Sequence, residues 1–514
     1  MTPDTDSRYS ALAARDPRFD GVFYVGVTST GIYCRPVCTA RTPKAANCRF
    51  FDSAAAAEGA SFRPCLRCRP ELAPGNAPVD DAQRIAALLV QRIEEGMLDH
   101  ATGLEQVAVK FGWSSRQIRR IVHRELGVSP IELVLTRRLL LAKQLLTDTS
   151  LPISEVAFAS GFSSLRRFND AFSNRYGIPP TRLRAAADDM KAKPLSSSSF
   201  TLQLAYRPPF DWDGILHFLR ARTLRGVERI DGDAYFRTVQ LGAHTGWISV
   251  RNSAAKRVLQ VELPHSLTPV LPALLGRLRN FFDLSARPDL ISEQLMRDPM
   301  LTDVVAGNPG MRVPGAFDGF ELAVRAVLGQ QISVKAATTL AGRFINAFGE
   351  KIATPHESLT HLAPTAQRVA ELNVDGIASL GVIRSRARSV IALAADIASG
   401  KLELDAGAEP ESTMKQLTAI SGIGKWTAHY IAMRALRWPD AFPKEDVVLR
   451  NILGRVTAAR AEELSQPWRP WRSYATLHLW RVAASSTANS ANRSHAHPEP
   501  AARIHRDRVR AGRR

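Results

Sequence analysis

The sequence has no cysteine after residue 68, no long apolar run and too few acidic residues to balance its basic ones. Only five cysteines occur in 514 residues, so disulfides are not expected to stabilise the chain. Because no stretch of about 18 apolar residues is present, a membrane-spanning helix is excluded. The N-terminus also lacks the basic segment and apolar stretch of a secretory signal. These absences favour a cytoplasmic protein without a membrane partner.

The charge of the chain is strongly positive. Lysine and arginine number 68 against 49 acidic residues, which gives a formal net charge of +19. Such an excess favours an anionic partner, and nucleic acid is the first candidate. The hydrophobic content of 45% is ordinary for folded domains. Because the chain is too long for a single core, three or four domains are expected.

Four of the five cysteines have the spacing of a metal site. Cys34, Cys38, Cys65 and Cys68 form C-x3-C, a gap of 26 residues, and C-x2-C. This spacing suits one tetrahedral zinc ion, and four buried structural thiols are the alternative. Cys48 fits neither pair and is expected to be a small apolar residue. Alternating β-branched and aromatic residues broken by glycines predict a small α/β unit around these cysteines.

Two segments about fifty residues apart repeat one pattern: an apolar helix, a glycine, and two serines before a second helix. Gly112 and Gly161 suit the turns, and the serines suit helix N-caps. Basic residues at the start of such a helix reach phosphates and guanine edges in a major groove. A helical bundle with a solvated basic face is the alternative. The predicted DNA-contacting residues are Ser114, Arg116, Arg119, Arg120, Ser163, Arg166 and Arg167.

Both N-terminal regions resemble known families. The two repeats, with LTRRLLLAKQLL between them and GVSP and GIPPTRLR after them, resemble the AraC-type DNA-binding domain. Residues 8–72 resemble the N-terminal domain of Ada-type adaptive-response proteins through ARDPRFDGVFYVGVTSTGIYCRPVC and FRPCLRCRP. In that family a zinc-bound thiolate takes a methyl group from a methylated DNA phosphate, and Cys34 falls on the acceptor position. The likeness implies one zinc ion with a structural and a catalytic role, and a purely structural zinc site is the alternative.

Elementary electrostatics supports this role. Zinc keeps its thiols deprotonated, and the thiolate is the nucleophilic form. Methylating one of four zinc thiolates changes the formal charge from 2− to 1−. For a phosphate about 7 Å away this is worth roughly 0.6 kcal/mol in water and about 2.4 at an effective dielectric of 20, so DNA affinity is expected to rise several-fold to about a hundredfold. The transfer is stoichiometric. The O6-alkylguanine transferase domain of many Ada-type proteins is excluded, because it needs a further cysteine.

The segment LTAISGIGKWTAHYIAMRALRWPDAFPKEDVVLR, residues 417–450, is the strongest signal in the second half. Its Ser-Gly-Ile-Gly sequence predicts a tight hairpin between two helices, where backbone N–H groups approach a DNA phosphate. About twenty residues later, Asp446 precedes a predicted helix. This arrangement resembles the helix-hairpin-helix glycosylase superfamily, specifically the AlkA-type 3-methyladenine DNA glycosylase II. The likeness covers residues 198–482.

The likeness places the catalytic aspartate of that family on Asp446. An alkylated purine is a good leaving group, so the enzyme mainly extrudes it and stabilises the positive sugar. Glu445 is the competing carboxylate but is expected to point elsewhere, and the alternative role for Asp446 is a helix N-cap. Tyr430 and Trp480 match residues that stack near the flipped base, with core packing as the alternative. Trp468 and Trp471 are expected in the core.

The sequence departs from the family pattern at two positions. Trp426 replaces the Schiff-base lysine of the bifunctional members, which predicts a monofunctional glycosylase. Gln331 replaces the leucine wedge that fills the vacated base stack in the best-known relative. The likeness further implies DNA contacts and a monovalent-cation site. The implied DNA-binding residues are Gln330, Gln331, Gly422, Gly424 and Lys425, and the implied cation ligands are the backbone carbonyls of Thr418, Ile420 and Ile423.

These inferences predict a multidomain α+β protein. The expected parts are a zinc-binding α/β methyl-acceptor domain (1–76), an all-α double helix-turn-helix domain (77–186), a flexible linker (187–200), a small α+β domain (201–284), an all-α helix-hairpin-helix glycosylase domain (285–482) and a disordered basic tail (483–514).

The expected function is excision of alkylated purines, coupled to methyl transfer onto cysteine and to control of the alkylation response. We expect a monomer whose partners are alkylated DNA, promoter DNA and RNA polymerase. One alternative is a transcriptional regulator with a vestigial glycosylase half. In the other, the two N-terminal domains only target the enzyme to DNA.

Overall fold

The computed structural model describes residues 5–16, 19–20, 23–51, 54–68, 70, isolated residues between 86 and 108, 113–188, 198–406 and 408–494. Within these residues the multidomain α+β architecture predicted from the sequence is confirmed. No helix in this part of the chain is long and apolar enough to cross a bilayer.

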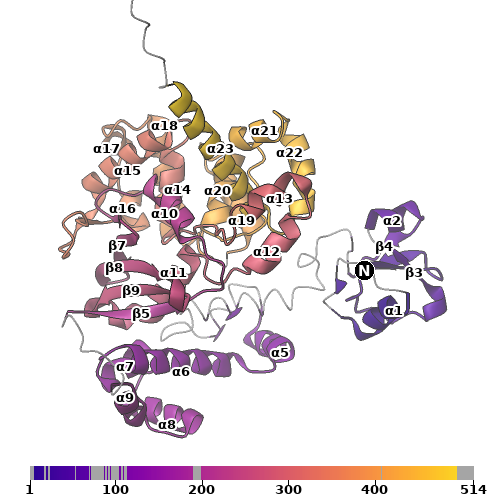
Figure 1. Cartoon of the computed structure of the whole chain (residues 1–514), viewed down its shortest axis with the longest axis horizontal. Coiled ribbons are helices and arrows are strands. Elements are labelled where there is room, and N and C mark those ends of the chain that lie inside the picture. The colour runs from indigo at the N-terminus through magenta and orange to yellow at the C-terminus, as the bar shows by residue number, and fades with distance from the viewer. Residues whose placement is uncertain are drawn as a thin grey trace, which may run out of the picture. The chain divides into compact units, whose positions relative to one another are not determined.

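The N-terminal domain is a four-stranded sheet between two helices (Figure 1). The strand order is β3-β1-β2-β4, and alternating residues of the strands serve opposite faces. Val25 and Phe50 pack with Leu12 of one helix, whereas an adjacent residue in each strand, Tyr24 and Phe51, packs with the other helix. The elements are α1 (Thr5–Ala14), β1 (Tyr24–Val27), β2 (Ile32–Cys34), β3 (Cys48–Phe51), α2 (Ala54–Gly59) and β4 (Arg63–Pro64).

The next domain is helical, and its second helix-turn-helix is described completely. Gly161 has φ +92° in the turn between α7 and α8, and Ser164 caps α8. The cap is thus one residue later than the predicted Ser163. Ser114 caps α5 in a capping box with Gln117, as expected, whereas Gly112 lies outside the described residues. The helices are α5 (Ser115–Leu126), the connecting helix α6 (Pro130–Asp148), α7 (Ile153–Ala159), α8 (Leu165–Tyr176) and α9 (Pro180–Asp188).

An antiparallel five-stranded sheet follows, with the order β5-β9-β8-β7-β6 (Figure 1). Its strands are β5 (Ser199–Ala205), β6 (Glu228–Asp231), β7 (Ala234–Leu241), β8 (His244–Ser253) and β9 (Val258–Pro264). The helix α10 (Trp212–Arg220) comes after the first strand, and α11 (Leu271–Phe281) closes the unit as predicted. The predicted linker 187–200 overlaps α9 and β5 at its ends, and residues 189–197 lie outside the described part.

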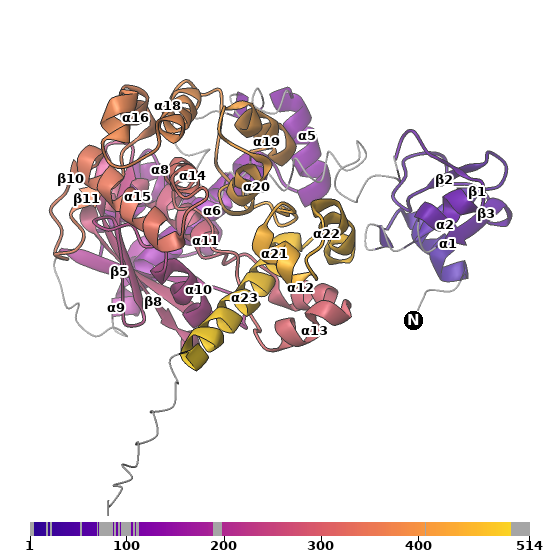
Figure 2. The same ribbon diagram turned by 90° about the horizontal axis from the view of Figure 1, so that it is seen from above.

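The C-terminal part is built around α14, most of whose residues are buried. In both views α19 and α20 run side by side (Figures 1 and 2). The helices are α12 (Pro288–Leu295), α13 (Pro299–Ala306), α14 (Gly319–Leu328), α15 (Val334–Phe348), α16 (Ala366–Ala370), α17 (Val374–Ala378), α18 (Arg384–Ala398), α19 (Pro410–Ala419), α20 (Lys425–Arg434), α21 (Val447–Ile452), α22 (Ala458–Leu464) and α23 (Arg472–Ser494).

Two expectations for this part were wrong in detail. The domain is not helical throughout, because β10 (Glu350–Lys351) and β11 (His361–Leu362) form a short antiparallel pair after the chain leaves α15 at Gly349. The predicted disordered tail does not begin at residue 483, because α23 continues to Ser494. Residues 495–514 lie outside the described part.

A buried ion-pair cluster joins the sheet to the helical domain. Arg237 of β7 lies 2.8 Å from Glu321 of α14 and 3.6 Å from Glu228, and all three side chains are almost fully buried. Burial raises the pKa of Glu321 despite the nearby guanidinium. At Glu228 burial acts in the same direction, but Arg237 and then Arg325 outweigh it and lower the pKa. The cluster depends on the charge of Arg237.

We expect Arg237→Met to destabilise the protein by about 3–5 kcal/mol, because it leaves the buried Glu321 without its ion-pair partner and leaves Glu228 with Arg325 alone. The loss should grow as the pH rises and both groups must ionise. The midpoint of thermal unfolding, followed by tryptophan fluorescence, measures the effect. Arg229→Met is the control, because Arg229 pairs with Asp231 at the surface and should cost less than about 1 kcal/mol. Equal effects of the two substitutions would contradict the prediction.

Candidate active site and zinc centre

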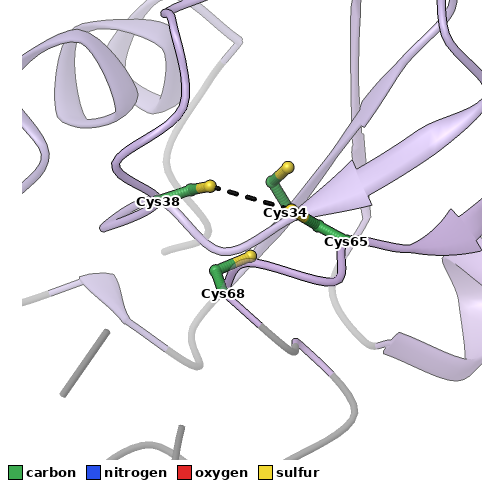
Figure 3. A group of neighbouring side chains, drawn as sticks. All are labelled: Cys34, Cys38, Cys65 and Cys68. Atoms are coloured by element: carbon green, nitrogen blue, oxygen red, sulfur yellow. Dashed lines mark hydrogen bonds between the residues drawn. The ribbon is translucent and has the colours of Figure 1, made fainter. Parts of the chain in front are cut away.

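The four predicted cysteines meet where two parallel strands end (Figure 3). Cys34 is the last residue of β2 and Cys65 directly follows β4, so the pairing of these strands brings both thiols together. Cys38 and Cys68 come from the segments that follow. All four Sγ atoms lie within 4.8 Å of one another, and those of Cys38 and Cys65 are 4.0 Å apart. Tetrahedral zinc separates its sulfurs by about 3.8 Å, so the set fits one zinc ion.

The thiols of this cluster differ in exposure. Cys34 is partly exposed, whereas Cys38, Cys65 and Cys68 are buried. Hydrogen bonding to Cys38 and then to Cys68 raises the pKa of the Cys34 thiol, whereas hydrogen bonding to Cys34 and then to Cys68 lowers the pKa of Cys38. Cys34 therefore keeps its proton until a cation displaces it. The nearby Arg35 donates its backbone N–H to Cys68 Sγ at 3.4 Å. The Arg35 guanidinium is paired with Asp20, so it does not neutralise the negative charge of the sulfur atoms.

The predicted hairpin is the turn between α19 and α20. Gly422 has φ +90° there, and a Cβ at this position would lie 2.3 Å from Ser389 Oγ of α18. The same hydroxyl donates to Ser421 O at 2.6 Å, so α18 holds the turn in place. Gly422, Gly424 and Lys425 are exposed, and Gly424 caps α20 without a side chain. The first N–H groups of α20 therefore remain available to an external acceptor.

Asp446 is both a helix cap and a residue of a cavity wall. Its Oδ1 accepts from Leu449 N at 2.8 Å and caps α21, and it also accepts from Trp480 Nε1 at 3.2 Å. Its Oδ2 accepts from Trp426 Nε1 at 2.8 Å. The N-cap interpretation of this residue is therefore confirmed, and its catalytic role stays a prediction. Three N–H donors from three segments of the chain fix the orientation of the carboxylate.

The cavity next to Asp446 has a volume of about 530 Å³, within the range of pockets that hold small ligands. Trp426, Tyr430 and Trp480 line it, as do small apolar residues of α14 and α15. The Trp426 and Tyr430 rings are stacked with centroids 5.5 Å apart and planes 6° apart, and Trp480 lies 6.3 Å from Tyr430. Glu445 is not among the lining residues. Aromatic faces beside a fixed carboxylate suit a flat, flipped base.

The two glutamines before α15 have different environments. Gln331 is exposed and has φ +55°, a backbone conformation that residues other than glycine rarely adopt and that clusters at functional sites. Gln330 donates through Nε2 to Gly422 O at 2.9 Å and to Thr427 Oγ1 at 3.0 Å. Gln330 therefore ties the segment that carries Gln331 to the hairpin. The DNA contacts of both residues stay predictions.

The arginines predicted to contact DNA lie at the surface of the helix-turn-helix domain. Arg116, Arg119 and Arg120 are exposed on α5, and Arg166 and Arg167 are exposed on α8. Arg119 approaches Glu105 at 3.4 Å and Arg166 approaches Asp170 at 4.0 Å. Exposed pairs of this kind are weak and do not prevent a phosphate contact.

Sequence reasoning missed several residues of the cavity. The sequence identifies Trp426 only as the residue that replaces a lysine, whereas in the structure its Nε1 donates to Asp446 Oδ2. Trp426, Tyr430 and Arg434 are each four residues apart, which places all three on one face of a helix. This spacing could have identified Trp426 as a cavity residue from the sequence. Arg222 and Arg325, which also line the cavity, carry no such signal, because they come from distant segments. Trp468 is fully buried away from the cavity, as predicted.

Comparison with known families assigns a separate family to each of four segments of the chain. It matches the metal binding domain of Ada over residues 7–71, a helix-turn-helix domain over 107–186, the AlkA N-terminal domain over 201–318, and the HhH-GPD superfamily of base excision DNA repair proteins over 324–469. These matches and the site define a class, the base excision glycosylases fused to an Ada-type metal-binding domain and a helix-turn-helix domain.

Individual proteins that resemble this chain belong to the same class or to one of its parts. The probable bifunctional transcriptional activator/DNA repair enzyme AlkA of Mycobacterium tuberculosis is 40% identical over 485 residues, which cover 93% of this chain and 97% of that protein. DNA-3-methyladenine glycosylase 2 of Escherichia coli is 34% identical over 54% of this chain and 95% of its own length. The bifunctional enzyme Ada of Escherichia coli is 34% identical over 24% of this chain and 34% of its own length. This chain belongs to the family of bifunctional transcriptional activator/DNA repair enzymes of the AlkA type.

Trp426→Phe should lower the rate of base release by about ten- to a hundredfold, because it retains the stacked ring but removes an N–H donor to the Asp446 carboxylate. The rate of 3-methyladenine release from methylated DNA under single-turnover conditions measures the effect. Trp471→Phe is the control, because Trp471 packs on Tyr474 away from this cavity and its loss should leave the rate unchanged. A rate equal to wild type in Trp426→Phe would show that the hydrogen bond is dispensable.

Proposed function

We propose that this chain excises alkylated purines of the 3-methyladenine type, with Asp446 as the catalytic carboxylate. The observation that carries the proposal is the position of this carboxylate, which three N–H donors hold at the wall of an aromatic-lined cavity. A methylated purine carries positive charge and is attracted to the faces of aromatic rings such as Tyr430 and Trp480.

The reaction needs little from the protein beyond this geometry. The N-glycosidic bond breaks, its electron pair goes to the purine, and positive charge develops on the sugar. The Asp446 carboxylate stabilises that charge and orients a water molecule, whose oxygen bonds to C1′ as its proton is lost to solvent. No lysine is among the described residues that line the cavity, and Lys425 lies exposed at the hairpin. The enzyme is therefore monofunctional and leaves the DNA strand uncut.

The hairpin and the wedge hold the DNA during this reaction. The exposed backbone of Gly422 and Gly424 and the Lys425 ammonium bind a phosphate near the lesion. Carbonyls of Thr418, Ile420 and Ile423 bind a monovalent cation that reinforces this contact. Gln331 occupies the vacated space in the base stack, where its amide also pairs with the orphaned base. Its exposure and left-handed backbone support this position.

The N-terminal domain accepts a methyl group from a methylphosphotriester on Cys34. Its partial exposure beside three buried thiols supports this choice of sulfur. The thiolate attacks the methyl carbon, and the phosphate oxygen leaves as a diester anion. Cys34, Cys38, Cys65 and Cys68 would hold one zinc ion, which would keep the Cys34 thiol deprotonated. Loss of one negative charge then strengthens promoter binding by the helix-turn-helix domain.

Several properties complete the proposal. Promoter-bound protein contacts RNA polymerase, the chain acts as a monomer, and it works in the cytoplasm, where its DNA substrate lies. A regulator with a vestigial glycosylase half is the competing function. The aromatic cavity and the fixed carboxylate favour the enzyme.

Asp446→Asn tests the enzymatic function. Asparagine is also a good N-cap, so the variant should fold, but without the charge base release should fall by about a hundredfold or more. The assay measures 3-methyladenine released from methylated DNA by the full chain. If wild type and variant release equally little, the regulator without enzymatic activity is the better description.

Methyl transfer should raise the affinity of wild type for its promoter several-fold to about a hundredfold. A gel shift before and after incubation with methylphosphotriester DNA measures this change, and zinc content is measured in parallel. Cys34→Ser should accept no methyl group, whereas Cys48→Ser should behave as wild type, because Cys48 lies outside the cluster. Methyl uptake without a change of affinity would mean that the N-terminal domains only target the enzyme.

A further inference from the structure

A second cavity adjoins the one beside Asp446. It has a volume of about 570 Å³, residues of both α10 and α23 line it, and the two cavities share Trp480. Four of its lining residues recur along one face of α23: Leu477, Trp480, Arg481 and Ala484. Phe218 is among those that line it from α10. Much of the space between these two helix faces is therefore not filled by side chains.

An ion pair in the wall of this cavity joins the two helices. Arg481 of α23 pairs through Nη1 with Asp211 Oδ2, and both residues line the cavity. Asp211 is itself fixed, because its Oδ1 caps α10 by accepting from Gly214 N at 2.9 Å and its own N–H donates to Gly310 O at 3.1 Å. The pair therefore attaches α23 to a fixed point of α10, one residue after Trp480.

The sequence provides the space for this ion pair at Gly214. The glycine lies within α10, where it disfavours the helix by up to about 1 kcal/mol relative to alanine. Its backbone is not in the left-handed region, so conformation does not require a glycine. A Cβ at this position would lie 2.7 Å from Arg481 Nη1 and closer still to Asp211 Oδ2. A larger residue would therefore displace the ion pair.

The ion pair matters more for position than for stability. The Arg481 side chain is 39% exposed and the Asp211 side chain 17%, and ion pairs in contact with solvent contribute at most about 1 kcal/mol. Trp480 Nε1, in contrast, lies 3.2 Å from Asp446 Oδ1, the longest of the three hydrogen bonds to that carboxylate. Hydrogen bonds weaken steeply beyond this length, so a small shift of α23 would break this one.

We propose that Asp211 and Arg481 are positioning residues for base excision, which act through Trp480. Their ion pair holds α23 where the Trp480 indole N–H reaches the Asp446 carboxylate. Without the pair, the carboxylate loses one of its three donors and is free to turn away from the sugar. The inference rests on the proposed function, because the position of Trp480 affects the reaction only if Asp446 is the catalytic carboxylate.

Three substitutions remove the ion pair in different ways. Arg481→Gln removes the cation, Asp211→Asn removes the anion but retains a good N-cap, and Gly214→Ala places a methyl group in the space of the pair. Arg481→Lys is the conservative variant. Arg220→Gln is the control, because this exposed arginine of α10 donates to Gly232 O and lines neither cavity.

Release of 3-methyladenine from methylated DNA by the full chain is measured in single turnover over a range of protein concentrations. This experiment gives a maximal rate and a half-saturating concentration for each variant. The midpoint of thermal unfolding is measured in parallel. Arg481→Gln is also combined with Trp480→Phe, which retains an aromatic ring but has no N–H donor.

Each of the three substitutions should lower the maximal rate by about tenfold and change the half-saturating concentration by less than about twofold. The midpoint of unfolding should fall by no more than a few degrees, because a partly exposed pair adds little stability. Arg481→Lys should retain most of the rate, and Arg220→Gln should match wild type. In the Trp480→Phe background, Arg481→Gln should lower the rate by less than about a further twofold, because the pair acts through the indole N–H.

The same tenfold loss from Arg481→Gln in the Trp480→Phe background would overturn the proposal, because the ion pair would then act independently of Trp480. A higher half-saturating concentration at an unchanged maximal rate would also overturn it and make Arg481 a DNA contact. So would unchanged rates in all three variants, or a loss of rate that follows a large fall in the unfolding midpoint. A wild type that releases no 3-methyladenine would instead refute the proposed function, and the role of the ion pair with it.

Discussion

The hydrogen bonds around the Asp446 carboxylate organise the glycosylase site. They come from α20 through Trp426, from the start of α21 through Leu449 N, and from α23 through Trp480. Each donor also belongs to the cavity or to a helix end, so the carboxylate, the aromatic walls and the packing of three helices form one unit. An enzyme that stabilises a positive sugar needs its negative charge in place before the bond breaks. Here three hydrogen bonds fix in advance the carboxylate that we propose for this role.

Charge is arranged in opposite ways at the two reactive centres. The zinc-binding cysteines concentrate negative charge on sulfur, and the neighbouring Arg35 does not offset it, because it is paired with Asp20. The glycosylase cavity is instead lined by one carboxylate, Asp446, and by three arginines, Arg222, Arg325 and Arg434. The first arrangement makes a nucleophile that loses charge on reaction. The second gives the cavity an excess of positive charge around its single acidic residue.

Local signals predicted local structure well. The capping serine of α5, the glycine turn of the second helix-turn-helix and the hairpin before α20 follow from residue types whose backbone and side-chain preferences act over a few positions. The pairing of β2 with β4, which brings Cys34 to Cys65, joins distant segments of the chain. The cysteine spacing nevertheless predicted that the four thiols form one cluster. Asp446, Tyr430 and Trp480 came from family resemblance, and the structure places them around one cavity.

What the sequence could not show depends on packing between distant segments. Arg222 meets Tyr430 across more than two hundred residues, and no periodicity relates the two. The same holds for the Arg237 cluster, where a strand residue neutralises a helix residue. The β10–β11 pair escaped prediction because two residues on each strand are too few to make a pattern. Contacts of this kind become visible only once the chain is folded.

The amide bridge from Gln330 to the hairpin links two actions on DNA. One end of this short connection carries Gln331, the residue that we propose as the wedge, and the other end is the turn that we propose as the phosphate contact. Because Gln330 joins the two, a wedge and a phosphate contact at these places would keep a fixed spacing, and the depth to which the wedge enters the duplex would be set by the protein rather than by the DNA.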